Sequence, residues 1–269
     1  KLPITVFHKV EERDSCMRLT VQLTAAQDVY FNYRQLLSTG YRHDNCQFYM
    51  PGFWYRRNLR SPKKAPSFHT SDSWLVREDR LSAPLTGIFS EKEKRFMTVN
   101  RLDDFSMDAL ATHKEGEIIL SGKTSLGFTG FENQQGIAML SFGFPYREAP
   151  KSYIRKLTLA PEVEAFQLMK KGESVLLTWE IMESGADDFS DFIQHTWEHC
   201  YDTYAPKPVE NSYSIADMKQ VLSCFFVNSL VDNQPLVYNS GIHLKVSDCE
   251  RNGQAEVCLL YTSPSPRDS

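Results

Sequence analysis

Several features are scarce or missing in this sequence of 269 residues. No apolar run is long enough to cross a bilayer, since the best candidate, Val221 to Val231, is interrupted by Ser223, Asn228 and Ser229. Basic charge is not in excess either, because 30 Lys and Arg residues stand against 34 Asp and Glu residues. A general nucleic-acid-binding protein needs a basic surface. We therefore expect no membrane span and no nucleic-acid partner.

Motifs for metal, nucleotide or nucleophilic chemistry are missing as well. The sequence has no CxxC pair, no HExxH, no GxSxG and no Walker or Rossmann glycine pattern. His195 and His199 have the spacing of metal ligands on a helix, but Thr196, Trp197 and Glu198 between them do not form the zinc motif. The sequence therefore predicts no metal site and no cofactor, and it leaves the catalytic residues unknown.

The two ends of the chain are unusual. Residues 258–269, CLLYTSPSPRDS, closely resemble a translated sequencing adapter, although a natural Ser/Pro-rich tail is the alternative. We therefore expect 257 native residues, cut from a longer reading frame, and five native cysteines of six. Their scattered positions predict packing residues, with a disulfide or two if the protein is exported. Because the chain does not begin with Met, the lack of a signal peptide is uninformative.

Apolar and polar residues alternate along much of the first two thirds of the chain. The longer alternating runs are 17–24, 138–144, 156–159 and 175–181, and shorter runs are 4–7, 74–77, 96–99 and 118–120. Turn pairs such as Gln135-Gly136 and Lys171-Gly172 separate them. One buried face and one wet face are typical of antiparallel sheets. The sequence therefore predicts a mainly β fold, an antiparallel β-sandwich.

The spacing of apolar residues becomes helical after residue 184. Between Asp187 and Tyr204 they recur every three or four positions, and Pro206 then ends the helix. A second helix begins at a capping box, Ser214 to Asp217, and its broad apolar stripe requires burial. We predict four segments: a β-sandwich at 1–183, a helical linker at 184–213, the start of a helical domain at 214–257, and the adapter tail at 258–269.

Residues 47–62, QFYMPGFWYRRNLRSP, form the densest candidate binding segment. Pro51-Gly52 indicates a turn or loop rather than a regular strand. Aromatic faces stack on the C–H faces of sugars, while Arg and Asn bond hydroxyls and Arg can clamp a carboxylate. Alternatively, the aromatic side chains fill one end of the sandwich and the arginines extend to solvent. The candidate substrate-binding residues here are Trp54, Tyr55, Arg56, Arg57, Asn58 and Arg60.

Residues 74–80, WLVREDR, form a second candidate cluster at a strand end. Its four charged side chains can form two salt bridges at the edge of the sandwich, which is the interpretation we favour. They can also form a site in which Arg77 or Arg80 orients Glu78 or Asp79, and such a carboxylate stays ionised. From this cluster we take Trp74, Arg77 and Asp79 as further candidates for substrate binding.

The order of these segments resembles the front of the six-hairpin glycosidases. The resemblance rests on residues 168–181 (LMKKGESVLLTWEI), 186–204 (ADDFSDFIQHTWEHCYDTY) and Ile215 onward. In that family a β-super-sandwich leads through a helical linker into a barrel of paired α-helices. The resemblance implies carbohydrate processing in the periplasm or outside the cell. It also places the two catalytic carboxyl groups on barrel loops, and almost all of that barrel would be missing here.

These observations lead to one functional hypothesis and two alternatives. We predict the N-terminal part of a glycoside hydrolase acting on an oligo- or polysaccharide, truncated before the first helices form a barrel. The isolated chain would then be inactive. The alternatives are a non-catalytic carbohydrate-binding sandwich and a polysaccharide lyase. The sugar, the linkage and the oligomeric state stay open.

Overall fold

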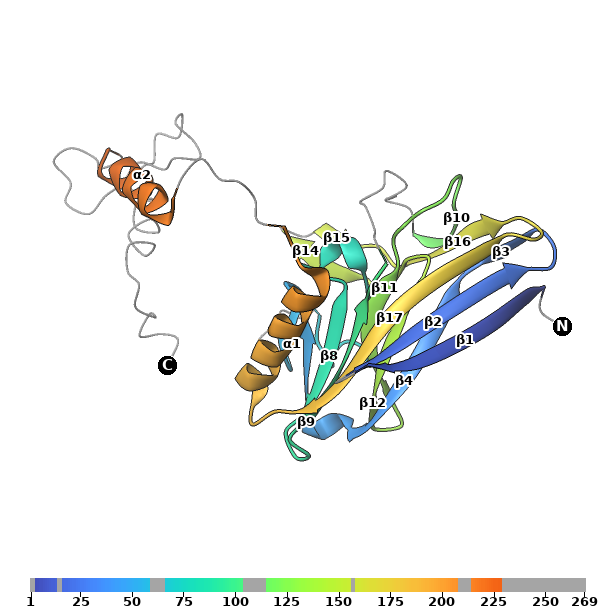
Figure 1. The fold of residues 1–269 in the computed structure, drawn as a ribbon, viewed down its shortest axis with the longest axis horizontal. Coiled ribbons are helices and arrows are strands. Elements are labelled where there is room, and N and C mark those ends of the chain that lie inside the picture. The colour runs from blue at the N-terminus through green and yellow to red at the C-terminus, as the bar shows by residue number, and fades with distance from the viewer. Residues whose placement is uncertain are drawn as a thin grey trace. The chain divides into compact units, whose positions relative to one another are not determined.

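The computed structural model describes residues 3–13, 16–58, 66–103, 115–155, 158–207 and 214–228. The chain divides into two compact units, 1–205 and 206–269, which are described separately. The first unit is built of β-strands and one α-helix (Figure 1). The four segments expected from the sequence stay a prediction, and the adapter-like residues 258–269 lie outside the described residues.

The largest sheet of the first unit has seven strands, each antiparallel to its neighbours. In spatial order they are β1 (Ile4–Arg13), β2 (Cys16–Ala25), β17 (Ser174–Gly185), β9 (Arg95–Arg101), β8 (Leu85–Ser90), β5 (Cys46–Met50) and β6 (Trp54–Arg56). The last of the described strands, β17, therefore lies in the interior of the sheet, between β2 and β9 (Figure 1).

A second, four-stranded sheet faces the first. Its spatial order is β4 (Tyr33–Arg42), β12 (Ile137–Phe144), β11 (Phe128–Gln134) and β7 (Ser73–Arg77). A third sheet, also of four strands, contains β10 (Gly116–Ile119), β16 (Val163–Met169), β13 (Arg147–Glu148) and β3 (Val29–Phe31). A separate pair contains β14 (Ser152–Arg155) and β15 (Thr158–Ala160). The β10–β16 pair is parallel, and the other described pairs are antiparallel. The predicted mainly β sandwich is confirmed.

Three of the alternating sequence rows, 17–24, 138–144 and 175–181, form much of the core between the two large sheets. Buried side chains come from β2 (Leu19, Val21, Leu23), β12 (Ala138, Leu140, Phe142) and β17 (Leu177, Trp179, Ile181). The predicted turn at Gln135-Gly136 joins β11 to β12, and both residues have positive φ angles, 53° and 81°. Positive φ at both central residues matches the right-handed twist of a hairpin. These rows and this turn explain why the sandwich was predictable.

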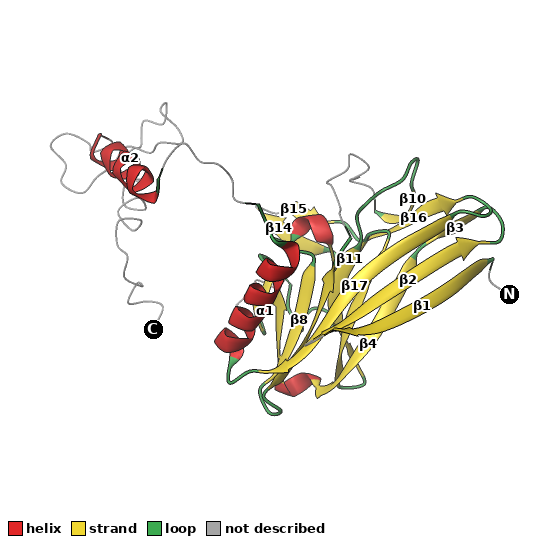
Figure 2. Cartoon of the chain, viewed as in Figure 1, coloured by secondary structure: helices red, strands yellow, loops and turns green. Residues whose placement is uncertain are grey.

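Helix α1 (Phe189–Tyr204) covers the outer face of the seven-stranded sheet (Figure 2). Asp188 caps its first turn by accepting from the backbone N–H groups of Ser190 and Asp191, at 2.7 and 2.9 Å. Phe192 packs there against Phe89 and Phe96. The sequence predicts one wet face for this sheet, but the helix buries part of the second face as well.

The segment at 47–62 differs from the sequence expectation. Residues 46–50 and 54–56 are strands β5 and β6, and Pro51 to Phe53 form the turn of the hairpin that joins them. Gly52 occupies the left-handed region, with a φ of 79°. The Pro-Gly pair therefore marks a turn correctly, but the residues around it are regular strands rather than a loop.

The second unit is described through helix α2 (Ile215–Asn228). The predicted capping box is confirmed: Asp217 N–H donates to Ser214 Oγ at 3.1 Å, and Ser214 N–H donates to the Asp217 carboxylate at 3.0 Å. The described apolar side chains of this helix, including Val221 and Leu222, are exposed. No helix within the described ranges combines the length and hydropathy needed to cross a membrane.

Candidate functional site

Two predicted binding residues, Trp54 and Trp74, lie in the core of the sandwich. Both rings are almost fully buried, with exposed fractions of 0% and 1%, and their centroids lie 5.7 Å apart. The indole N–H of Trp54 donates to Arg56 O at 2.9 Å, and that of Trp74 donates to Ser71 O at 3.0 Å. Neither ring presents a face to solvent, so this position does not favour a stacking role. Their part in substrate binding stays a prediction.

Tyr55 lies on the opposite face of strand β6 from Trp54, and Arg56 is the last residue of the strand. Tyr55 is 52% exposed, and its hydroxyl accepts from Gly52 N–H at 3.2 Å. The guanidinium of Arg56 lies 5.2 Å from the centroid of the Phe189 ring on α1, a cation–π contact. These two predicted residues are open to solvent, but their side chains do not point into the pocket described next.

Arg57 is the predicted residue that lines a pocket. This pocket, which we call the His43 pocket, has a volume of 240 Å³ and is lined by His43, Asp44, Cys46, Phe48, Arg57, Phe68 and His69. Arg57 donates to Cys46 O at 3.3 Å and to Asp44 O, and its Nη2 lies 3.7 Å from the carboxylate of Glu91. Asn58 donates to Pro66 O beside the pocket. Arg60 lies outside the described residues.

The floor of the His43 pocket is aromatic. His43 belongs to the short 3₁₀ turn η1 (His43–Asn45), which connects β4 to β5. Its ring meets Phe68 edge-on at 4.3 Å and lies 5.0 Å from the ring of Phe48. Phe48 comes from β5, and Phe68 and His69 come from the turn that precedes β7. Three separate parts of the chain thus meet around one opening.

Burial lowers the pKa of His43, so its imidazole is neutral at physiological pH. Its Nε2 atom is buried and has no hydrogen-bond partner among the described residues. A buried nitrogen without a partner costs free energy unless a ligand or water bonds to it. Burial also raises the pKa of the Cys46 thiol to about 12, which makes it a poor nucleophile. The pocket therefore suits binding better than covalent catalysis.

Sequence reasoning found Arg57 but missed most of this pocket. His43 and His69 lie 26 positions apart, and neither belongs to a recognisable motif. Their convergence depends on the β4–β5 connection and on the turn before β7, which no local pattern specifies. The aromatic density of residues 47–62 was the one available signal.

The charges of the 74–80 cluster are mostly buried and paired. Arg77 binds Asp79 through two hydrogen bonds of 3.0 and 2.6 Å. Glu78, in the 3₁₀ turn η2 (Glu78–Arg80), accepts from Arg101 at 2.6 Å and from Gly127 N–H at 2.7 Å. Burial raises the pKa of Glu78 against the opposing attraction of Arg101. These contacts favour structural pairing, and the substrate-binding roles of Arg77 and Asp79 stay predictions.

Glu148 on β13 is the least satisfied member of this charged cluster. Its Oε1 lies 2.7 Å from Arg80 Nε, but neither carboxyl oxygen has a hydrogen-bond donor in favourable geometry among the described residues. The side chain is 2% exposed. Burial raises its pKa to about 7, and the arginines at positions 80 and 77 oppose this rise. Glu148 therefore titrates near neutrality, unlike an ordinary surface carboxyl.

Comparisons with known proteins give weak likenesses. No family model matches the sequence, and neither does any curated protein. The Slr1438 protein from Synechocystis sp. PCC 6803 shares 8% identity over 67% of this chain and 54% of its own, with a TM-score of 0.35. A proposed aldose 1-epimerase from Klebsiella pneumoniae shares 8% identity over 79% of this chain and 54% of its own, with a TM-score of 0.39.

A TPR-domain containing protein from Parabacteroides distasonis shares 9% identity over 98% of this chain and 44% of its own, with a TM-score of 0.37. This chain thus spans about half the length of each of these three solved structures. Likenesses this weak carry no argument about ligand or activity.

Proposed function

We propose that the sandwich binds carbohydrate and that the His43 pocket holds one sugar ring. The observation that carries this proposal is the meeting of the half-buried Phe68 ring with polar groups of His43, Arg57 and His69 around one opening, above the buried ring of Phe48. Sugars present apolar C–H faces and a rim of hydroxyls, so they need this combination. Arg57 can also pair with the carboxylate of a uronic acid.

The size of the His43 pocket supports a single ring rather than a longer chain. Its 240 Å³ lies below the range of about 300–1,000 Å³ that is usual for drug-sized ligands.

The proposal is tested by glycan-array screening of the purified chain, followed by calorimetry with the monosaccharides of the best-bound glycan and with glucuronate. His69→Ala and Arg57→Ala should each weaken binding about tenfold, which corresponds to about 1.4 kcal/mol. His69 is exposed and Arg57 half-buried, so both variants should fold. Arg95→Ala is the matched control, since Arg95 is exposed and pairs with Glu183 rather than lining the pocket.

Tyr55→Ala separates this site from the neighbouring exposed ring. If the sugar occupies the His43 pocket, Tyr55→Ala binds as tightly as the unaltered chain. Loss of binding in Tyr55→Ala, with His69→Ala and Arg57→Ala unaffected, would place the sugar on strand β6 and contradict the pocket assignment.

The activity of the protein that contains this sandwich is proposed from the family resemblance alone. We infer glycoside hydrolysis in the periplasm or outside the cell, with catalytic carboxyl groups outside this chain. We therefore expect the purified chain to release no sugar from any glycan that it binds, as measured by reducing-end assay. Cleavage at an enzymatic rate would place an active site within these residues, and an unsaturated uronate product would identify a lyase.

A further inference from the structure

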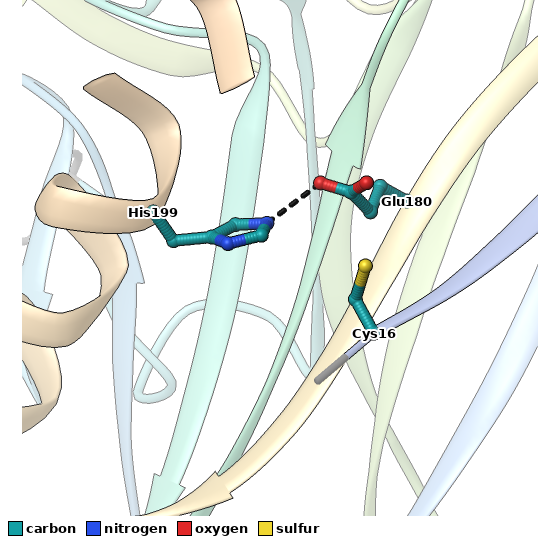
Figure 3. A group of neighbouring side chains, drawn as sticks. All are labelled: Cys16, Glu180 and His199. Atoms are coloured by element: carbon teal, nitrogen blue, oxygen red, sulfur yellow. Dashed lines mark hydrogen bonds and ion pairs between the residues drawn. The ribbon is translucent and has the colours of Figure 1, made fainter. Parts of the chain in front are cut away.

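Three side chains with metal-binding atoms meet between helix α1 and the seven-stranded sheet. They come from residues that lie far apart in the sequence. Cys16 is the first residue of β2, Glu180 lies on β17, and His199 lies on α1. In the β2–β17 ladder Cys16 is opposite Met182 and Arg18 is opposite Glu180, which places Cys16 and Glu180 diagonally on one face of the sheet. That face is the one covered by α1, so His199 extends to it from the helix (Figure 3).

The three ligand atoms are close together. One atom from each residue, the Cys16 Sγ, a Glu180 carboxylate oxygen and a His199 ring nitrogen, lies within 4.8 Å of the others. His199 Nε2 and Glu180 Oε1 are 2.6 Å apart and share a hydrogen bond (Figure 3). Glu180 is 6% exposed and His199 is 23% exposed, measured on their side chains. The group is thus partly shielded, with access to solvent on the histidine side.

We propose that Cys16, Glu180 and His199 form a site for a divalent zinc ion. One thiolate, one imidazole and one carboxylate are all ligands that zinc accepts in tetrahedral geometry. A thiolate with an imidazole disfavours magnesium and calcium, which prefer oxygen ligands throughout. Three protein ligands leave the fourth position for water or another molecule. This site revises the expectation from the sequence that the chain has no metal site.

The present geometry needs only a small adjustment to hold the ion. Zinc lies about 2.0–2.3 Å from its ligands, so tetrahedral ligand atoms are about 3.3–3.8 Å apart. The 2.6 Å contact between His199 and Glu180 must lengthen, and the more distant pairs must close, which side-chain rotation can provide. A thiolate and a carboxylate together carry two negative charges, which balance the charge of the ion.

Two neighbouring groups modify this site. Thr203 Oγ1 lies 3.3 Å from Glu180 Oε1 and can hold the carboxylate in place, as outer partners of metal ligands do. Arg18 Nη2 lies 3.9 Å from the other carboxylate oxygen, Oε2, and its positive charge opposes a cation. Arg18 therefore leaves Oε1 as the oxygen that faces the histidine and the ion. The site would join two strands of the sheet to the covering helix.

Cobalt(II) tests the site in the full chain, because thiolate ligation to cobalt gives a charge-transfer band in the near ultraviolet. The chain, freed of metal by chelation, should bind one equivalent of cobalt with this band, and one equivalent of zinc should displace it. Cys16→Ser should remove the band, and His199→Gln should weaken binding about 100-fold or more, or about 2.7 kcal/mol. Far-UV circular dichroism of each variant verifies folding.

Two matched variants serve as controls. Cys224→Ser removes an exposed thiol on α2, and His195→Gln alters a histidine one turn away on α1 that pairs with Asp191 instead. Both should keep the band and the affinity. A chain that binds no stoichiometric cobalt overturns the proposal, and so does a band that persists in Cys16→Ser. The cobalt titration of the unaltered chain needs no variant, so it tests the proposal even if a substitution prevents folding.

Discussion

Replacing Trp54 with alanine should lower the free energy of unfolding by about 4 kcal/mol, the usual cost of removing a large buried aromatic side chain. Trp54 is fully buried among Phe68, Trp74 and Phe131, with ring centroids 5.0, 5.7 and 5.0 Å away. Its removal leaves a cavity and breaks the hydrogen bond to Arg56 O. Urea unfolding followed by far-UV circular dichroism measures the loss.

Tyr55→Ala is the matched control for Trp54→Ala, because the two rings are adjacent on β6 and point to opposite faces. Tyr55 is half-exposed, so its replacement should cost about 1 kcal/mol or less. Equal losses in the two variants would show that Trp54 is not a core residue. The stability of these two variants also affects how their binding data are interpreted. Because Trp54 is a core residue, loss of glycan binding in Trp54→Ala would indicate disturbed folding rather than a lost stacking contact.

Glu148→Gln should change how stability depends on pH. The folded-state pKa of Glu148 is about 7, above its ordinary value of 4.5, because burial disfavours the charged form. Between these two values the unfolded chain is ionised while the folded chain keeps the proton. Unfolding therefore releases a proton, and the stability of the unaltered chain falls as pH rises through this window.

The size of this effect follows from the pKa difference. A rise from 4.5 to about 7 corresponds to about 3 kcal/mol. The stability of the unaltered chain minus that of Glu148→Gln should thus fall by about 3 kcal/mol between pH 4 and pH 8, as measured by urea unfolding at each pH. All other titrating groups are common to both chains and cancel. A difference that stays constant over this range would show that Glu148 is not buried in its charged cluster.

Much of the sandwich was predictable because its strands alternate regularly. Leu19 and Val21 on β2, and Leu177 and Trp179 on β17, form rows that point to one core. The second buried face was not predictable, since Glu180 resembles a solvent-facing residue in an alternating strand. It is buried because α1 folds back over the sheet, and no local pattern shows which face a helix will cover.

The candidate sites were less predictable than the fold. Arg57 was found through the aromatic density around it, but Trp54 in the same segment lies in the core. The sequence does not distinguish a buried aromatic side chain from an exposed one. Only the strand register of β5 and β6 determines which side chain faces the core. His43 and Cys16 could not be assigned to sites, because each meets its neighbours through contacts between distant parts of the chain.

The position of β17 between β2 and β9 also constrains the order in which the protein can fold during synthesis. Leu19 on β2 is paired with Trp179 on β17, 160 positions later. A ribosome adds about 5–20 residues per second, so β2 waits about 8–32 s for this neighbour. Until then β2 has only β1 beside it in this sheet. The apolar side chains of the β1–β2 hairpin are exposed during that interval. We therefore expect chaperones that bind unfolded chains to bind this hairpin then.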